Sequence, residues 1–293
     1  PNDSTIVLEY DSLMVSWLAT DNMGLDSIFI FFSTNPNLYE YELVTNLTSL
    51  SSEKIIHIPS GVTEMASVKI IAKDIYDNEG VGLSDAFSIL DNTVPTVELN
   101  ELSDTEIGDL TSISWISDDN TGLANHILYY TVDNTMDAIL IDTLDGRSTG
   151  FNWLVPNIVS DSARIIIEAY DIVGLNAMDT TELFSISDGL SPEILVLSPS
   201  INTSIPEYSD LAISWFAEDN IQLDSIEIFY SNNPDHEMDF VAQVHAELGE
   251  YFLSIPEGVT DSAQVKLIVS DIYGNESQDL SEYFSVTDFS MPT

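Results

Sequence analysis

The chain repeats itself three times with a period close to 100 residues, and this triplication restricts its possible folds more than any other feature. Trp17, Trp115 and Trp215 are separated by 98 and 100 residues. Five further landmarks follow each tryptophan in register: Pro59, Pro156 and Pro256; Asp74, Asp171 and Asp271; Phe87, Phe184 and Phe284; Asp91, Asp188 and Asp288; Pro95, Pro192 and Pro292. A period of this length indicates one small structural unit per copy, arranged in a linear array. We expect repeat 1 at residues 1–94, repeat 2 at 95–191 and repeat 3 at 192–293.

Repeat 1 lacks a segment that the other two repeats contain. Pro1 aligns with Pro199, and "EYDSLMVSW" matches "EYSDLAISW". Before that point repeat 3 has "PEILVLS" and repeat 2 has "PTVEL", whereas repeat 1 has no counterpart. We predict that the first strand of repeat 1 is missing and that the sequence is a window of a longer polypeptide. Repeat 3 should close at "DFSMPT" with the start of a further junction.

Strand periodicity dominates every repeat. Runs such as "SIFIFF", "SVKIIAKD" and "ARIIIEAYD" are rich in Ile, Val, Phe and Tyr, alternate with period two, and are bounded by Asn, Asp, Gly and Pro. Roughly seven short strands in about 100 residues, with an early tryptophan, are typical of an all-β sandwich. We expect three tandem immunoglobulin-like or fibronectin III-like β-sandwiches in an extended array.

The motifs "ISWFAEDN", "IPEGVTDSAQVKLIVSDIYGNES" and "YFSVTD" resemble bacterial and archaeal extracellular immunoglobulin-like or fibronectin type III-like repeats. The resemblance extends over the whole chain, in three copies. It implies the sandwich fold and a place in an adhesin, a surface-layer protein or the accessory region of a secreted enzyme. The acidic, proline-containing junctions are also similar to those of cadherins, which bind calcium, although the cadherin linker motif itself is not reproduced.

The charge of the chain limits its partners. Fifty Asp and Glu residues face six Lys and Arg, a formal net charge of −44, while 44% of the residues are hydrophobic, enough for folded cores. Such a surface repels nucleic acids and anionic membranes and attracts cations. A saline or marine setting, or bound calcium, would reduce the self-repulsion. The chain has no Cys, which excludes disulfides and thiolate metal sites, and no apolar run of about eighteen residues that would span a membrane.

In several strands, alternate side chains face the core, and the last side chain of that series is a carboxylate. Trp17, Ala19 and Asp21 share one face of a strand, and Ala72 and Asp74 share one face of another. The same pattern recurs in the later repeats and at Asp91 and Asp188, which end the last strand of their repeats. In this fold the loops after the second and sixth strands lie at the end where the chain enters the domain. We therefore expect Asp91 and Asp188 each to meet two acids of the following repeat.

Three converging carboxylates require a counter-charge that six basic residues do not supply, and a hard divalent cation with oxygen ligands does. Calcium suits irregular loops better than magnesium because its coordination is flexible. The predicted ligands of this structural Ca²⁺ are Asp91, Asp119, Asn120, Asp171, Asp188, Asp219, Asn220, Asp271 and Asn275, with Asp21 and Asp74 as the corresponding residues of repeat 1. An alternative stays open, because Asp followed by Asn or Gly also forms Asx-turns that bind only backbone amides.

No catalytic motif accompanies these acids, and their recurrence in every repeat is typical of architecture rather than of a single active site. We predict that this segment is not an enzyme. The leading hypothesis is an extracellular, bacterial or archaeal surface segment, such as an adhesin stalk, filament or surface layer, that calcium stiffens at its junctions. The alternative is an accessory, carbohydrate-binding region of a secreted hydrolase. Expected partners are the neighbouring repeats, with further copies of the chain or a cell-surface polysaccharide as candidates, and neither a nucleic acid nor a membrane span.

Overall fold

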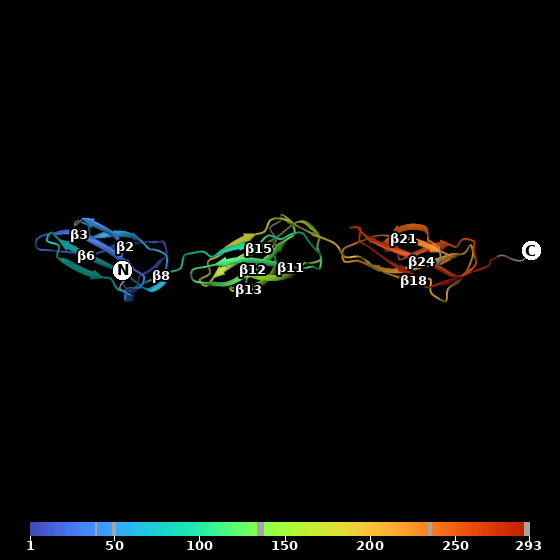
Figure 1. Ribbon diagram of the computed structural model, residues 1–293, viewed down its shortest axis with the longest axis horizontal. Helices are drawn as coiled ribbons and strands as arrows, with labels where there is room; N and C mark the ends of the chain where they lie inside the picture. Colours follow the sequence, from blue (N-terminus) through green and yellow to red (C-terminus); the bar gives the residue numbers. More distant parts are fainter. Residues whose placement is uncertain (39, 49–50, 134–137, 234–235, 290–293) are drawn as a thin grey trace, which may run out of the picture.

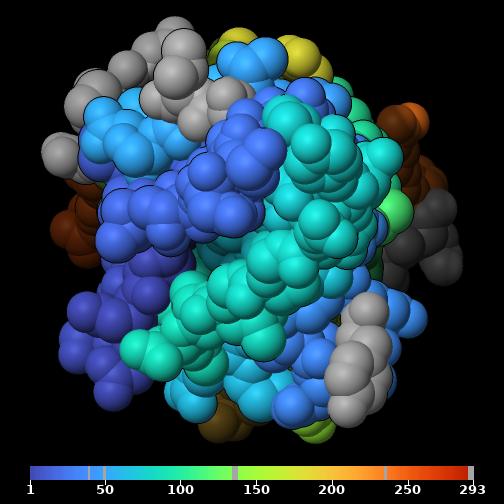
Figure 2. Space-filling model, turned by 90° about the vertical axis from the view of Figure 1, so that its left-hand side faces the viewer, coloured from blue at the N-terminus to red at the C-terminus, as the bar shows by residue number. Residues whose placement is uncertain are grey.

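The computed structural model describes residues 1–38, 40–48, 51–133, 138–233 and 236–289 of the protein. Its three sandwich units follow one another along a single axis, joined by short connections (Figure 1). Seen along that axis, repeat 1 hides most of the other two repeats (Figure 2). Residues 290–293, where we expect the start of a further junction, lie outside the described ranges. No helix in the described part is long and apolar enough to cross a membrane.

The described ranges are almost entirely β-structure. The elements of repeat 1 are β1 (Ile6–Leu8), β2 (Ser12–Ser16), β3 (Leu25–Ser33), η1 (Pro36–Leu38), β4 (Glu42–Thr48), β5 (Glu53–His57), β6 (Thr63–Asp74), β7 (Glu79–Leu83) and β8 (Phe87–Leu90). Those of repeat 2 are β9 (Thr96–Leu99), β10 (Thr105–Glu106), β11 (Leu110–Asp118), β12 (Leu123–Thr131), β13 (Ile139–Asp145), β14 (Gly150–Leu154), β15 (Ser160–Asp171), β16 (Asn176–Thr180) and β17 (Phe184–Ser187). Those of repeat 3 are β18 (Glu193–Ser198), β19 (Ser204–Pro206), β20 (Asp210–Glu218), β21 (Leu223–Ser231), β22 (Asp239–His245), η2 (Ala246–Leu248), β23 (Glu250–Ser254), β24 (Thr260–Asp271), β25 (Glu276–Leu280) and β26 (Phe284–Thr287).

Repeats 2 and 3 share one two-sheet topology. In repeat 2, one sheet has the order β10-β17-β15-β12-β13 with β16 beside β15, and the other has the order β14-β11-β9. Repeat 3 has the same arrangement, with β19-β26-β24-β21-β22 and β25 in one sheet and β18-β20-β23 in the other. Pairing is antiparallel except where the short strands β10 and β19 run parallel to β17 and β26. This topology confirms the predicted fold class of tandem immunoglobulin-like or fibronectin III-like sandwiches.

Each core lies between the two sheets of its repeat, as the alternating pattern predicts. Along β15 the side chains of Ile165, Ile167 and Ala169 are fully buried, and the residues between them are half-buried. Trp115 comes from the opposite sheet and joins the same apolar cluster with 2% of its surface exposed. Because each such row ends as the strand leaves the sandwich, the next inward residue lies at the rim, and there the sequence places an aspartate.

Repeat 1 keeps the larger sheet, in the order β1-β8-β6-β3-β4 with β7 beside β6, but its second sheet contains only β2 and β5. A third strand, equivalent to β9 and β18, is missing from the described residues of this sheet. Strand β2 also ends at Ser16, while β11 and β20 continue through their tryptophans to Asp118 and Glu218.

Candidate metal centre

Two clusters of three aspartates lie at the two connections between repeats. Junction 1 contains Asp91, which follows β8, together with Asp119, which follows β11 of repeat 2, and Asp171, which is the last residue of β15. Each residue contributes one carboxylate oxygen to a group whose members all lie within 4.8 Å of one another. The loops that carry Asp119 and Asp171 are tied together, because the Ile172 amide donates a hydrogen bond of 3.1 Å to the Gly122 carbonyl.

Junction 2 repeats this arrangement one unit further along the chain. Asp188 follows β17, Asp219 follows β20 of repeat 3, and Asp271 is the last residue of β24. One oxygen from each of the three again lies within 4.8 Å of the others. In both clusters the first aspartate (Asp91 or Asp188) and the last (Asp171 or Asp271) are buried, and the middle one is half-buried. Each cluster therefore joins a side chain of one repeat to two side chains of the next.

Asx-turns fix the orientation of these carboxylates. Asp171 Oδ1 accepts the amides of Val173, Gly174 and Leu175 at 2.6–2.9 Å. Asp119 Oδ1 accepts the amides of Thr121 and Gly122 at 2.8 and 3.0 Å. Both glycines have positive φ, 95° at Gly174 and 104° at Gly122, a conformation that closes the turn and that side chains rarely adopt. The turn chemistry anticipated from the sequence is therefore present, and it occupies one oxygen of each carboxylate.

The other oxygens of these groups are left over. Asp119 Oδ2 and Asp171 Oδ2 at junction 1, and Asp188 Oδ2 and Asp219 Oδ1 at junction 2, are buried and have no hydrogen-bond partner within the described part of the chain. Asp171 is only 2% exposed and Asp188 only 8%. A buried acceptor without a partner is costly, and the cost is greater when it carries charge. Turn formation therefore accounts for one oxygen of each of these four aspartates and leaves the other without a hydrogen-bond partner in the part of the chain that the structure describes.

The strand-end aspartate is held as an anion. Burial acts to raise the pKa of Asp91, but hydrogen bonds from the Thr121 hydroxyl and the Thr93 amide, with contributions from Glu9 and Asn120, outweigh it and keep the pKa below its ordinary value. At junction 2, burial of Asp271 is likewise outweighed by hydrogen bonds, led by those from Asn275, and its pKa is lowered. The hydrogen bonds therefore favour the charged form of one aspartate in each cluster.

This arrangement suits a hard cation that takes oxygen ligands. Calcium binds oxygens at about 2.3–2.6 Å, so two oxygens on the same ion are at most about 5 Å apart. The separations within 4.8 Å in both clusters satisfy that limit. The residues that would hold the ion are the three aspartates of each junction, and their partnerless oxygens are the first ligands it would receive. Metal binding by these residues stays a prediction, which the geometry makes specific.

The predicted asparagine ligands act here as hydrogen-bond donors. Asn120 Nδ2 donates to both carboxylate oxygens of Glu9, at 3.1 and 3.3 Å. Asn220 Nδ2 donates to Asp188 Oδ1 at 3.1 Å, and Asn275 Nδ2 donates to Asp271 Oδ2 at 2.8 Å. All three side chains thus support the acidic clusters through nitrogen, and their role as direct oxygen ligands stays a prediction.

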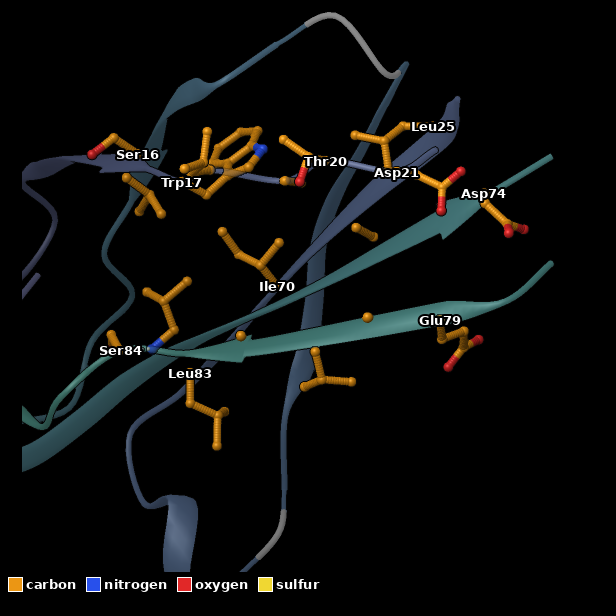
Figure 3. Close-up of a pocket in the computed structure, with 18 of the residues that line it drawn as sticks. Ser16, Trp17, Thr20, Asp21, Leu25, Ile70, Asp74, Glu79, Leu83 and Ser84 are labelled. Atoms are coloured by element: carbon orange, nitrogen blue, oxygen red, sulfur yellow. Dashed lines mark hydrogen bonds between the residues drawn. The ribbon is translucent and has the colours of Figure 1, made fainter. Parts of the chain in front are cut away.

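Asp21 and Asp74 lie at the other end of repeat 1, where the structure brings two acids together (Figure 3). Asp21 is exposed and accepts the amides of Met23 and Gly24, while the half-buried Asp74 accepts those of Tyr76 and Asn78. The sequence pattern predicts a core-facing Asp21; its exposure follows from the end of β2 at Ser16, before the inward row is complete. No third carboxylate joins this pair in the described part of the chain to form a triad like those at the junctions.

Glu9 is a member of junction 1 that the repeat alignment did not single out. Its side chain is fully buried and accepts the Thr93 hydroxyl at 2.9 Å, the Gly61 amide and the Asn120 side chain. The structurally equivalent residues are Ile107 and Glu207, because the amides of all three donate to the last strand of their repeat. The match between "EYDS" and "EYSD" could have identified Glu9, because it aligns Glu9 with Glu207. Repeat 2 has Ile107 at this position, so the glutamate does not recur in all three repeats.

No family model matches the chain, and a comparison with curated proteins found no match. Among solved structures, the chain is similar to a tetra-tandem repeat from the extending region of a large adhesion protein, with 14% identity, coverage of 95% of this chain and 70% of that one, and a TM-score of 0.36. It is also similar to a chain of a solved structure that concerns host cell surface retention of a 1.5-MDa bacterial ice-binding adhesin, with 12% identity, coverage of 97% of this chain and 94% of that one, and a TM-score of 0.30. A third similar structure is that of the chicken CNTN1 FN1–FN3 domains, with 13% identity, coverage of 94% of this chain and 95% of that one, and a TM-score of 0.36.

These likenesses are of the sandwich arrangement, and the class of this chain rests on its own sheet order. The chain is a tandem array of immunoglobulin-like or fibronectin III-like β-sandwiches. What distinguishes it as a molecule is the pair of buried acidic clusters, each built from two successive repeats.

Proposed function

We propose that this chain is a structural segment of an extracellular surface protein, such as an adhesin stalk, a filament or a surface layer, and that calcium bound at its junctions stiffens it. The observation that carries the proposal is the division of each cluster between two repeats, with buried carboxylate oxygens that have no hydrogen-bond partner among the described residues. A cation bound there would have to be held by both repeats at once.

The proposed stiffening follows from the charges. Without a cation, the aspartates of one junction repel one another, and this repulsion favours separation of the repeats. With a cation, the same groups become shared ligands, and bending at the junction requires the loss of coordination bonds. Calcium sites in extracellular modules have dissociation constants of about 10⁻⁴–10⁻³ M, which suits surroundings rich in the ion. The large negative charge of the chain adds a general attraction for cations.

A structural role also accounts for the recurrence of the site. The two clusters use equivalent positions in successive repeats, as expected of joints in an array. We propose no catalytic role for the acids, because each of them is assigned to a turn, to its neighbouring repeat or to the cation. The extracellular location is part of the same proposal and rests on the need for abundant calcium.

Small-angle scattering with and without a chelator tests the stiffening. We expect calcium to give the longest and narrowest distribution of particle lengths, and EDTA to shorten and broaden it. Isothermal titration should show binding of about one ion per junction. If calcium binds but the scattering profile is the same in EDTA, stiffening is wrong and binding survives; if titration shows no binding, the calcium proposal is wrong altogether.

A further inference from the structure

The head loops of repeats 2 and 3, residues 119–122 and 219–222, differ in their third residue, which is Thr121 in one and Ile221 in the other. The Thr121 hydroxyl donates a hydrogen bond of 2.5 Å across junction 1 to Asp91 Oδ2. Ile221 has no donor in its side chain, and the corresponding oxygen of junction 2, Asp188 Oδ2, has no hydrogen-bond partner in the described chain. Junction 2 therefore gives up a polar contact at this position.

An apolar contact between repeats takes its place. Ile221 belongs to repeat 3, but its side chain packs against the apolar core of repeat 2 and is half-buried. Met23 has the same position in the head loop of repeat 1 and is 58% exposed, so the turn by itself does not bury this side chain. The Ile221 amide donates to Asp219 Oδ2 at 2.8 Å, which fixes the backbone that carries the side chain.

The tail of repeat 2, the end where its last strand β17 stops, is correspondingly apolar. Ile107 takes the position of Glu9, is 5% exposed and belongs to the cluster on which Ile221 packs. Val159 is half-buried and packs on the same cluster. Its counterparts Val62 and Val259 are 46% and 64% exposed. Only the tail of repeat 2, among the described residues, buries both positions with apolar side chains.

A third change in this tail removes the need for a charged group. In repeat 1 the buried Glu9 carboxylate accepts the Gly61 amide. Repeat 2 has Ile158 in place of that glycine, and the Ile158 amide donates instead to the Pro156 carbonyl at 2.8 Å. The loop is therefore satisfied within itself, and its surface can meet an apolar partner without leaving a buried donor unpaired.

We propose that Ile107, Val159 and Ile221 form an apolar lock, which holds junction 2 closed without a cation and makes the tail of repeat 2 specific for a head loop with an apolar third residue. Burial of apolar surface does not depend on the ionic state of the aspartates. The lock is therefore independent of the calcium binding proposed above.

The tail of repeat 1 selects the opposite kind of head loop. Its buried acceptors, Glu9 and Asp91, receive hydrogen bonds from Asn120 and Thr121. An apolar third residue there would leave Asp91 Oδ2 without this donor and would place carbon atoms beside a buried carboxylate, which is unfavourable. The two tails thus determine the order in which the repeats can be joined.

Distances between two spin labels across junction 2, measured in EDTA, test the lock. The chain has no Cys, so Thr143→Cys and Gln243→Cys provide two unique labelling sites at equivalent, exposed positions. We expect Ile221→Ala to lower the ratio of closed to open molecules at least about fivefold, because apolar surface returns to water. Ile221→Val should stay closed, and Ile272→Ala, the same change at an exposed residue of the same repeat, should have no effect. A closed Ile221→Ala variant, or an Ile221→Val variant as open as it, would overturn the lock.

Labels at Asn46→Cys and Thr143→Cys test the selection at junction 1 under the same conditions. We expect Thr121→Ile to lower the ratio of closed to open molecules at least about tenfold, because a buried acceptor loses its donor. Thr121→Ser keeps the hydroxyl and should preserve the closed state. If Thr121→Ile closes as well as the unchanged chain, the tails do not discriminate between head loops and the proposed specificity is wrong.

Discussion

The two junctions are built from the same aspartates but are completed in different ways. At junction 1 a fourth carboxylate, that of Glu9, is fully buried beside the cluster and is held by the Asn120 side chain. At junction 2 the equivalent of Glu9 is Ile107, a member of the apolar core of repeat 2. There two neutral contacts add to the hydrogen bond from Asn220 Nδ2 to Asp188 Oδ1: Asn220 Nδ2 also donates to Asn157 Oδ1 at 2.9 Å, and Asn157 Nδ2 donates to the Asn220 backbone carbonyl.

The difference indicates how strongly the closed geometry of each junction depends on a bound cation. Junction 1 has more negative charge, and its contacts between repeats are made by charged groups, so its closed geometry needs neutralisation more strongly. Junction 2 has two amide contacts that hold the repeats together whatever the ionic conditions. We expect junction 1 to bind calcium more tightly and to open further when calcium is removed.

The largest effect is expected from Asp171→Asn. Asparagine keeps the oxygen that accepts the turn amides, so the loop should survive, but the variant loses a buried charged ligand. Calcium affinity at junction 1 should fall at least about a hundredfold, and the number of ions bound at millimolar calcium should fall by one. Calorimetric titration measures both quantities.

Asp224→Asn is the matched control for that variant, because it makes the same change of charge at an exposed position of β21. It should leave both sites intact. An equal loss of binding in the two variants would show that calcium responds to the overall charge of the chain and not to the cluster.

A smaller effect is expected from Glu9→Gln, which tests the comparison directly. Glutamine has one acceptor oxygen, which can keep the Gly61 amide, while its NH₂ group can donate to the Thr93 hydroxyl oxygen; the packing should therefore hold while one negative charge is lost. We expect calcium affinity at junction 1 to fall about tenfold, toward that of junction 2, because a negative charge beside the three aspartate ligands is lost. Glu207→Gln makes the same change at the equivalent position of repeat 3, outside both junctions, and should leave the two affinities unchanged.

Asn157→Ala should act on the other joint, and only when calcium is absent. It removes two hydrogen bonds to Asn220, each of about 1 kcal/mol, from a solvent-exposed contact. In EDTA, scattering should show a modest broadening at junction 2. Ser60 is the residue aligned with Asn157 in repeat 1, so Ser60→Ala serves as control and should change nothing. Broadening of the same size in both would remove the distinction between the joints.

The smallest effect on the joints is expected from protonation of His126, which lies in the core of repeat 2, the repeat shared by both junctions. His126 is fully buried, its Nε2 lies 2.8 Å from the Ser117 hydroxyl, and its Nδ1 lies 3.3 Å from the Asp145 carbonyl oxygen. Burial lowers its pKa, although the hydrogen bond and the charge of Asp145 oppose this. The unfolded chain therefore binds the proton more readily, so stability that is complete above pH about 6.5 decreases as the pH falls through that value.

Hydrogen exchange of the β12 and β15 amides, corrected for the intrinsic rate, should show this loss between pH 7.5 and 5.5. In repeats 1 and 3 the same pair of positions holds Ala19 with Ile28 and Ala217 with Ile226. The double variant Ser117→Ala, His126→Ile reproduces that apolar pair and should abolish the pH dependence of repeat 2. If the dependence persists in the double variant, other groups cause it.

Much of the fold follows from the sequence because two signals agree. The repeat of Trp17, Trp115 and Trp215 gives the number of units, and period-two alternation gives strands whose inward rows the structure buries. The same alternation led to Asp91, Asp119 and Asp171 as neighbours, since strand direction in a sandwich fixes which ends meet.

The rest of the junctions depends on contacts that no local pattern encodes. Glu9 reaches the cluster because β1 runs parallel to β8, a pairing between segments about eighty residues apart. Asn157 meets Asn220 because a loop of repeat 2 lies beside the next repeat, although the two residues are 63 positions apart. The exposure of Asp21 follows from the end of β2 at Ser16. Which oxygen of each aspartate is taken by its turn can be read only from coordinates.

The head-to-tail direction of each junction determines how the length of such a molecule can change. Every repeat offers two loop acids at one end and one strand-end acid at the other, so the contact is head to tail and does not close on itself. A unit inserted by gene duplication would bring one half of a joint on each side and would leave all existing joints unchanged. The length of the array can therefore change by one sandwich at a time during evolution, while the existing junctions keep their residues.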